Sequence, residues 1–142
     1  MKKKNPFLRI LAGLVGGILG YALISNMYEA GRSKSRLDAG LAYAANKMNQ
    51  KLPMMADSET RIDKVLAGPG KKLTYLVTLP NQKKSQIDLA TLQKSVRQNS
   101  INNYRTNQSM DELRAQNIEL DLKYFDSAGE SIFETVVSPK DF

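Results

Sequence analysis

The sequence predicts an α+β protein in which an N-terminal transmembrane helix precedes a small α-β-β-α-β-β domain with an antiparallel four-stranded sheet. Three observations lead to this fold class: one uncharged apolar segment near the N-terminus, two segments with apolar residues at helical spacing, and two pairs of β-rich segments joined by short turns. A chain of 142 residues has room for an anchor and one domain. We expect a basic cytoplasmic N-terminus (1–9), a transmembrane helix (10–28), a juxtamembrane linker (29–35) and an extracytoplasmic α+β domain (36–142).

The apolar segment predicts a membrane anchor. Residues 10–27 carry no charged side chain, and this length lies near the lower limit of the roughly 17–25 residues that cross a bilayer. A basic cluster precedes the segment: Lys2, Lys3, Lys4 and Arg9. Positive residues before a first helix favour a cytoplasmic N-terminus. We therefore expect the protein in a bacterial inner membrane, with its C-terminal domain in the periplasm.

A cleaved signal peptide is the alternative interpretation of the same segment. Gly20-Tyr21-Ala22 offers a small-x-small cleavage site. However, the apolar run continues past that site through Leu23 and Ile24, which favours a retained anchor.

Four glycines within the segment are spaced for helix packing. Gly13 and Gly17 are four residues apart, as are Gly16 and Gly20. Small residues at this spacing let two membrane helices approach closely. The stripe predicts a homodimer through the helix or pairing with another membrane protein.

The first half of the domain predicts one helix and one hairpin. Apolar residues recur at helical spacing over 37–52, and Pro53 ends that helix. Residues 60–67 and 73–79 are predicted strands, and the Gly-Pro-Gly-Lys stretch at 68–71 is their turn.

The second half repeats this plan with a different sequence. A capping-box pattern at Ser85 starts a helix that runs to about Tyr104, and a short helical turn follows at 110–117. Residues 118–125 and 130–137 are the strands of a second hairpin. Two hairpins with helices on one face give a layered α+β domain.

The composition excludes several kinds of chemistry. Cysteine and histidine are absent, so the chain has no Cys/His zinc site, no Cys nucleophile, no Ser-His-Asp triad and no disulfide. We therefore expect no enzyme, no metal and no cofactor. The net charge is +7, but bases and acids interleave beyond residues 1–9, which argues against a nucleic-acid partner.

A charged cluster is the first candidate for protein binding. Glu119 and Asp121 share the outward face of one predicted strand, and we expect Arg61 and Asp63 to lie near them. Paired carboxylates could serve a glycosidase, but alternating charges on a solvated sheet face are the more ordinary arrangement. We therefore expect both carboxylates to be exposed.

A polar segment after the second helix is the other candidate. Tyr104 and Arg105 belong to residue types that often anchor protein interfaces. Tyr43, Tyr75 and Tyr124 instead fall on or near apolar stripes, so we expect them in the core.

Four short motifs resemble a family of small membrane-anchored or secreted bacterial envelope proteins, mostly of unknown function. The motifs are Leu52-Pro53, Thr60-Arg61-Ile62-Asp63, Gly68-Pro69-Gly70, and Tyr124-Phe125-Asp126 with Gly129. The likeness covers roughly the last two thirds of the chain, and some members are similar to prophage superinfection-exclusion proteins. Many relatives carry a cysteine late in the second helix region and another at the C-terminal end. This chain has Phe142 there and no cysteine, so that clasp is missing.

Together these observations predict a non-catalytic, inner-membrane-anchored periplasmic protein-binding module. Its partners would be the membrane and a protein. The most specific function that the resemblance implies is superinfection exclusion, in which the chain meets a phage injection or tail protein and interferes with DNA entry. Two alternatives stay open: an immunity protein against a periplasmic toxin, and a structural subunit of an envelope complex.

Overall fold

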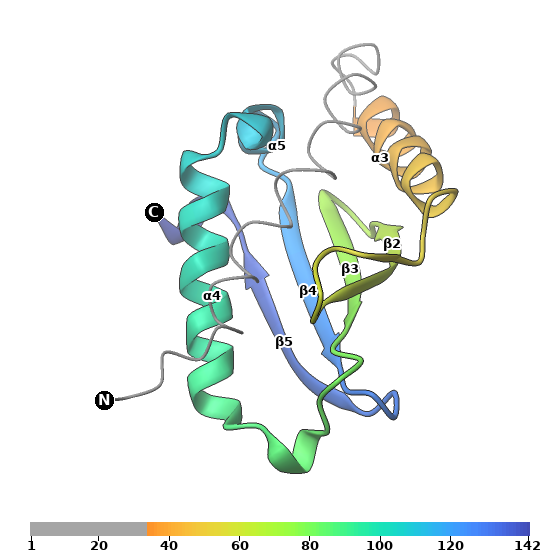
Figure 1. The fold of residues 1–142 in the computed structure, drawn as a ribbon. Coiled ribbons are helices and arrows are strands. Elements are labelled where there is room, and N and C mark those ends of the chain that lie inside the picture. Colours follow the sequence, from red (N-terminus) through yellow and green to blue (C-terminus); the bar gives the residue numbers. More distant parts are fainter. Residues whose placement is uncertain (1–33) are drawn as a thin grey trace.

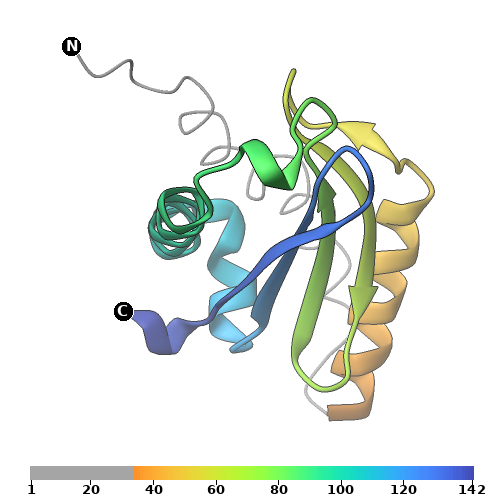
Figure 2. The same ribbon diagram turned by 90° about the horizontal axis from the view of Figure 1, so that it is seen from below.

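Residues 34–142 are the part of the chain that the computed structural model describes, and they contain one five-stranded sheet with helices beside it (Figure 1). Helix α3 packs on β2 near one edge of the sheet, and α4 packs on β5 at the opposite edge (Figure 2). In chain order the elements are α3 (Lys34–Asn49), β1 (Met54–Met55), β2 (Arg61–Ala67), β3 (Lys72–Thr78), η1 (Lys84–Gln86), α4 (Leu89–Thr106), η2 (Gln108–Met110), α5 (Asp111–Ala115), β4 (Glu119–Phe125), β5 (Ser131–Val137) and η3 (Pro139–Asp141).

The positions of the predicted helices and strands agree with the structure to within a few residues. Helix α3 ends at Asn49, three residues before the predicted end. Helix α4 starts later than predicted, because Asp88 and not Ser85 is its N-cap. The Asp88 carboxylate accepts hydrogen bonds from the Thr91 N–H and hydroxyl groups, which lowers the pKa of Asp88.

The predicted antiparallel four-stranded sheet is wrong in two respects. A fifth strand, β1, pairs with β2, so that Met54 lies opposite Ile62 and Met55 opposite Arg61. The central strands β3 and β4 run parallel, and the sheet is therefore mixed, with the spatial order β1-β2-β3-β4-β5.

The parallel pair follows from the connection between the two hairpins. Parallel neighbours need a long crossover, whereas antiparallel neighbours can be joined by a tight turn. Helix α4 has 18 residues and is about 27 Å long. Each central strand has seven residues and spans about 23 Å. The helix therefore returns the chain to the end of the sheet where β3 begins, and β4 starts from that end.

The membrane-spanning part of the predicted fold class has no counterpart among residues 34–142. Within residues 34–142, none of the helices has both the length and the apolar character that crossing a bilayer requires. The predicted segment 10–28 and its glycine stripe lie outside the described residues.

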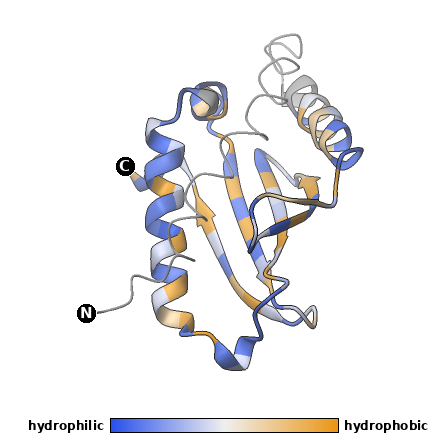
Figure 3. Ribbon diagram, in the orientation of Figure 1, coloured by the Kyte–Doolittle hydropathy of each residue, from blue (hydrophilic) through white to orange (hydrophobic). Residues whose placement is uncertain are grey.

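The pairing register places alternate strand residues on one inner face. Val65, Tyr75 and Leu122 are neighbours on three strands, and each is at most 1 % exposed. The alternation of apolar and polar residues along the strands is visible in Figure 3. Inner-face residues join one apolar core with the buried residues of the helices, which include Leu41, Ala44, Ala45 and Met48 of α3 and Leu92, Val96 and Tyr104 of α4.

Asn49 covers the outer edge of β2 beyond the short strand β1. Its side-chain Nδ2 donates to the Val65 carbonyl, and its Oδ1 accepts from the Val65 N–H, each at 2.8 Å. The amide thus takes the place of a residue on a neighbouring strand. Because unpaired strand edges attract other chains, the end of α3 protects this edge.

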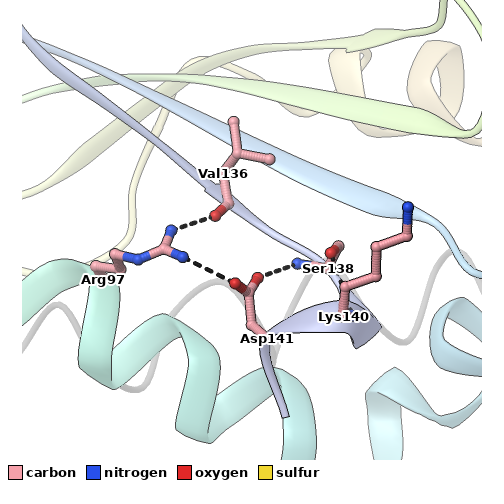
Figure 4. A network of polar contacts seen from close by, with 5 residues as sticks. All are labelled: Arg97, Val136, Ser138, Lys140 and Asp141. Atoms are coloured by element: carbon pink, nitrogen blue, oxygen red, sulfur yellow. Dashed lines mark hydrogen bonds and ion pairs between the residues drawn. The ribbon is translucent and has the colours of Figure 1, made fainter.

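Side chains of α4 cover the opposite edge in the same way. Gln93 Nε2 donates to the Glu134 carbonyl at 3.5 Å, and Arg97 Nη1 donates to the Val136 carbonyl at 2.6 Å (Figure 4). Both carbonyls belong to β5, the last strand of the sheet. The helix therefore supplies donors along an edge that has no further strand.

Arg97 also ties the C-terminal residues to α4. Its Nη2 lies 2.8 Å from Asp141 Oδ1, and Asp141 Oδ2 accepts from the Ser138 N–H at 2.8 Å (Figure 4). One residue further, the Phe142 ring meets the Tyr104 ring edge-on, with centroids 6.2 Å apart. An ion pair and an aromatic contact thus hold the C-terminal residues against α4.

The contact of Asn49 with the edge of β2 predicts that removing its side chain lowers the free energy of unfolding. Asn49→Ala leaves the buried N–H and C=O of Val65 without partners, so we expect a loss of about 2–4 kcal/mol in the free energy of unfolding. Denaturant unfolding measures this loss. Asn46→Ala, at an exposed position of the same helix, is the control and should cost less than about 0.5 kcal/mol. Equal effects of the two substitutions would contradict the edge assignment.

The Arg97 contacts predict a second, more local effect. Arg97→Met keeps the aliphatic stem but removes both hydrogen bonds, so we expect a loss of about 1–3 kcal/mol and faster hydrogen exchange at the Ser138 amide. Arg97→Lys should recover only part of the loss, because an ammonium lacks the planar fork. Arg105→Met, at an exposed position of α4, should leave the Ser138 exchange rate unchanged.

Candidate functional site

The sheet face opposite the core gathers most of the charged residues that the sequence analysis selects. We call it the outer face. Its members alternate in register with the core residues: Arg61, Asp63, Lys64 and Leu66 of β2; Lys72, Thr74, Leu76 and Thr78 of β3; Glu119, Asp121, Lys123 and Phe125 of β4; Glu134 and Val136 of β5. Bases and acids are equally numerous among them.

Asp63 is the centre of one polar group on this face. The register of β2 shifts between Ile62 and Lys64, so Asp63 sits at a bulge and points to the same side as Arg61. Arg61 Nε lies 2.5 Å from Asp63 Oδ1, and the Thr78 hydroxyl donates to Asp63 Oδ2. Arg61 and Asp63 therefore form an ion pair within one strand.

Asp121 is the centre of a second polar group, and its predicted exposure is wrong. It is only 2 % exposed, on a strand that has a neighbour on each edge. Burial raises the pKa of Asp121 to about 6. A hydrogen bond to Glu134 and the negative charge of that residue add to the rise, whereas Lys123 and Lys72 oppose it.

The structure separates the two groups that the sequence analysis placed together. Asp121 lies beside Thr74, whereas Asp63 contacts Thr78, four residues further along β3. Four residues of a strand span about 13 Å. Glu119 lies beside Lys72 at the far end and is half-buried. The outer face therefore carries two separate charged groups.

Tyr104 and Arg105 lie on different sides of α4. The Tyr104 ring is buried, and its hydroxyl donates to the Ile118 carbonyl at 2.6 Å, so burial raises the pKa of Tyr104 to about 12. Arg105 is exposed. Tyr43 is not in the core as predicted: it is 50 % exposed, with Lys47 Nζ 5.6 Å from its ring centroid. Tyr75 and Tyr124 are buried as expected.

Asp126 organises the turn at one end of the outer face. Its carboxylate accepts from the N–H groups of Lys84, Ala128 and Glu130 at 2.8–3.0 Å, and the bonds to the first and last of these contribute most to lowering its pKa. Gly129 completes the turn with φ +80°, a conformation that favours glycine. The Asp-x-x-Gly motif is thus explained by turn geometry, and it ties the β4–β5 turn to the segment after β3.

The outer face has the features of a protein-contact surface. Its charges are balanced, which does not favour nucleic acid. Leu66 is 40 % exposed, and Met55, opposite Arg61 in the register, is 48 % exposed. Within residues 34–142, no three acidic side chains are placed to hold a metal ion. Charged groups around partly exposed apolar residues suit a protein partner.

Two residues of these groups, Thr78 and Glu134, are absent from the sequence-based candidates. Thr78 reaches Asp63 because a bulge turns the carboxylate toward it, and no sequence signal marks that bulge. Glu134 meets Asp121 across β4 and β5, and alternation in residues 130–137 would have placed it on the outward side of the second hairpin.

Three solved structures share this fold. A pilotin of the type 2 secretion system from Vibrio vulnificus has a TM-score of 0.60 at 11% identity, covering 75% of this chain and 92% of its own. The type II secretion system pilotin AspS from Vibrio cholerae has 0.58 at 12% identity, covering 82% and 98%. A protein from Pseudomonas aeruginosa that is described as secreted has 0.59 at 14% identity, covering 76% and 94%.

These comparisons concern the fold. No protein-family model matches the sequence, and no curated protein matches it significantly. The fold is therefore one found in bacterial secretion proteins, in keeping with the resemblance to small envelope proteins, and none of the three structures concerns superinfection exclusion.

The Asp63 group predicts unequal effects of its two donors. Thr78→Val removes a donor from a position that is 7 % exposed, so we expect a loss of about 1–2 kcal/mol in unfolding free energy. Arg61→Gln should cost less than about 1 kcal/mol, because the Arg61 side chain is 40 % exposed. Denaturant unfolding at low and high salt measures both. Only the Arg61 effect should shrink with salt, and the reverse order of costs would contradict this geometry.

Proposed function

We propose that this chain is a non-catalytic protein-binding module that works outside the cytoplasm in the bacterial envelope, as part of an envelope assembly. The observation that carries the proposal is the fold, shared over most of both chains with two type II secretion pilotins. The outer face supports it, because its charges are balanced and the side chain of Leu66 is 40 % exposed there.

The polar groups of the outer face favour binding over catalysis. Asp121 and Glu134 interact with each other across neighbouring strands, whereas the two carboxyl groups of a glycosidase stand at least about 5 Å apart with the sugar between them. Asp121 is also too deeply buried to touch a substrate. Asp63 is already bonded to two neighbours of its own chain.

The shared fold favours one of the sequence-derived alternatives, a structural subunit of an envelope complex. Superinfection exclusion, by interference with phage DNA entry, is a narrower form of the proposal that rests on the sequence resemblance. Immunity against a periplasmic toxin is a second narrower form of the proposal. A phage challenge separates exclusion from the broader proposal, because an envelope subunit leaves phage DNA entry unchanged while its deletion disturbs an assembly in uninfected cells.

In vivo photo-crosslinking tests the outer face as the contact surface. A photo-reactive residue at Leu66, which is 40 % exposed, should give one discrete adduct with an envelope protein in cells that express the full chain. The same residue at Gln98, exposed on α4, is the matched control and should give none. Lys64→Glu and Lys123→Glu should weaken the adduct at least several-fold, because they reverse charges on the same face.

The opposite pattern would remove this surface from the proposal. Adducts from Gln98 but from none of the outer-face positions would place the contact on α4. A chain that gives no adduct at any exposed position, and whose deletion leaves the envelope unchanged, would overturn the proposed function itself.

A further inference from the structure

Asp121 is a buried acid with an unmet hydrogen-bonding requirement. It lies near the middle of the outer face, between Thr74 of β3 and Val136 of β5, and is 2 % exposed. Its Oδ1 atom is buried and has no hydrogen-bond partner. An ionised carboxylate in this position loses much of its hydration without full compensation, which favours the neutral acid.

The charged groups around Asp121 come from three strands. Lys72 of β3 and Lys123 of β4 oppose protonation, and Glu134 of β5 favours it. Glu119 precedes Asp121 by two residues on the same face. Neither lysine forms an ion pair with Asp121 within 4 Å, among the described residues. Glu134 is therefore the neighbour that favours the protonated form of Asp121.

A hydrogen bond between two carboxyl groups needs a proton on one of them. Asp121 and Glu134 face each other diagonally, since Asp121 pairs with Val136 and Lys123 pairs with Glu134. Each group is an acceptor when ionised and gains a donor when protonated. Asp121 is buried and Glu134 is exposed, so Asp121 is the side that keeps the proton.

We propose that Asp121 and Glu134 are a proton-binding pair, which shares one proton across β4 and β5 in mild acid and releases it toward neutral pH, so that mild acidification stabilises the folded domain. This proposal is independent of the proposed function and of any partner.

The direction of the pH dependence follows from the number of protons bound by the folded and the unfolded state. The pKa of Asp121 is raised to about 6 in the folded domain, above the ordinary value of about 3.9 in an unfolded chain. Between these values the folded state holds more protons than the unfolded state, so the contribution is complete below about pH 4 and is lost as the pH rises through 6. From pH 7.5 to 5.0 the folding equilibrium constant should rise about tenfold.

The composition leaves few other side chains that ordinarily titrate between pH 5.0 and 7.5. The sequence has no histidine, the side chain that ordinarily titrates between pH 5 and 8, and no cysteine. Asp126 and Asp88 have lowered pKa values, so the stability that they contribute is lost only at lower pH. A stability change between pH 5.0 and 7.5 can therefore be assigned to the pair.

Thermal unfolding of the full chain, kept in mild detergent, is the test. The wild type should unfold about 5 °C higher at pH 5.0 than at pH 7.5, which corresponds to the tenfold change. Asp121→Asn, which is isosteric, should abolish most of this difference and raise the midpoint at pH 7.5. Glu134→Gln should reduce it. Glu119→Gln, a neighbouring acid on the same strand and face, is the matched control and should keep it.

Carboxyl carbon NMR of Asp- and Glu-labelled chain provides the direct measurement. Asp121 should titrate near pH 6 in the wild type and lower in Glu134→Gln. An Asp121 signal that titrates below about pH 4.5, or a wild-type midpoint that is equal or lower at pH 5.0 than at pH 7.5, would overturn the proposal. If Asp121→Asn does not fold, the Glu134→Gln titration decides the question.

Discussion

The parallel pairing of β3 with β4 is the constraint on which the rest of the domain depends. Once two parallel strands are neighbours, the chain between them must travel the length of the sheet, and α4 provides that return. Helix α4 packs on β5 near one edge of the sheet, and α3 packs on β2 near the other. The parallel pairing also makes β4 a central strand with a neighbour on each edge. A polar residue such as Asp121 is buried there, although it faces away from the core.

Both edges of the sheet are covered by side chains of the flanking helices. Asn49 bonds to both backbone groups of Val65, and Arg97 bonds to the Val136 carbonyl. These are polar contacts with the backbone of edge strands, so each helix does more than cover apolar surface. Chains that approach either edge at these positions meet occupied hydrogen-bonding groups, and the outer face remains the broad surface of the sheet for a partner.

Local patterns predicted the elements but not their arrangement. Alternation in residues 118–125 identified β4 correctly, because side chains alternate in any strand. The same pattern appears in antiparallel and in parallel sheets, so it left the direction of β4 open. A central strand is recognised in a sequence by apolar residues on both of its faces. The charged residues Glu119, Asp121 and Lys123 on one face of β4 break that pattern. The two-residue strand β1 is too short for any periodicity.

The residues of the candidate site were likewise predicted, but their contacts were not. The partners Thr78 and Glu134 lie on strands next to the acids that they contact, and only the register brings them together.

The ring contact between Phe142 and Tyr104 and the ion pair between Arg97 and Asp141 bear on the compartments in which the chain can fold. A disulfide at such a position needs an oxidising compartment and a catalyst of thiol oxidation before the fold is secured. A ring contact and an ion pair form as soon as the segments meet, under reducing and oxidising conditions alike. The contact of the C-terminal residues with α4 therefore does not depend on the redox potential, and the domain can fold without thiol oxidation.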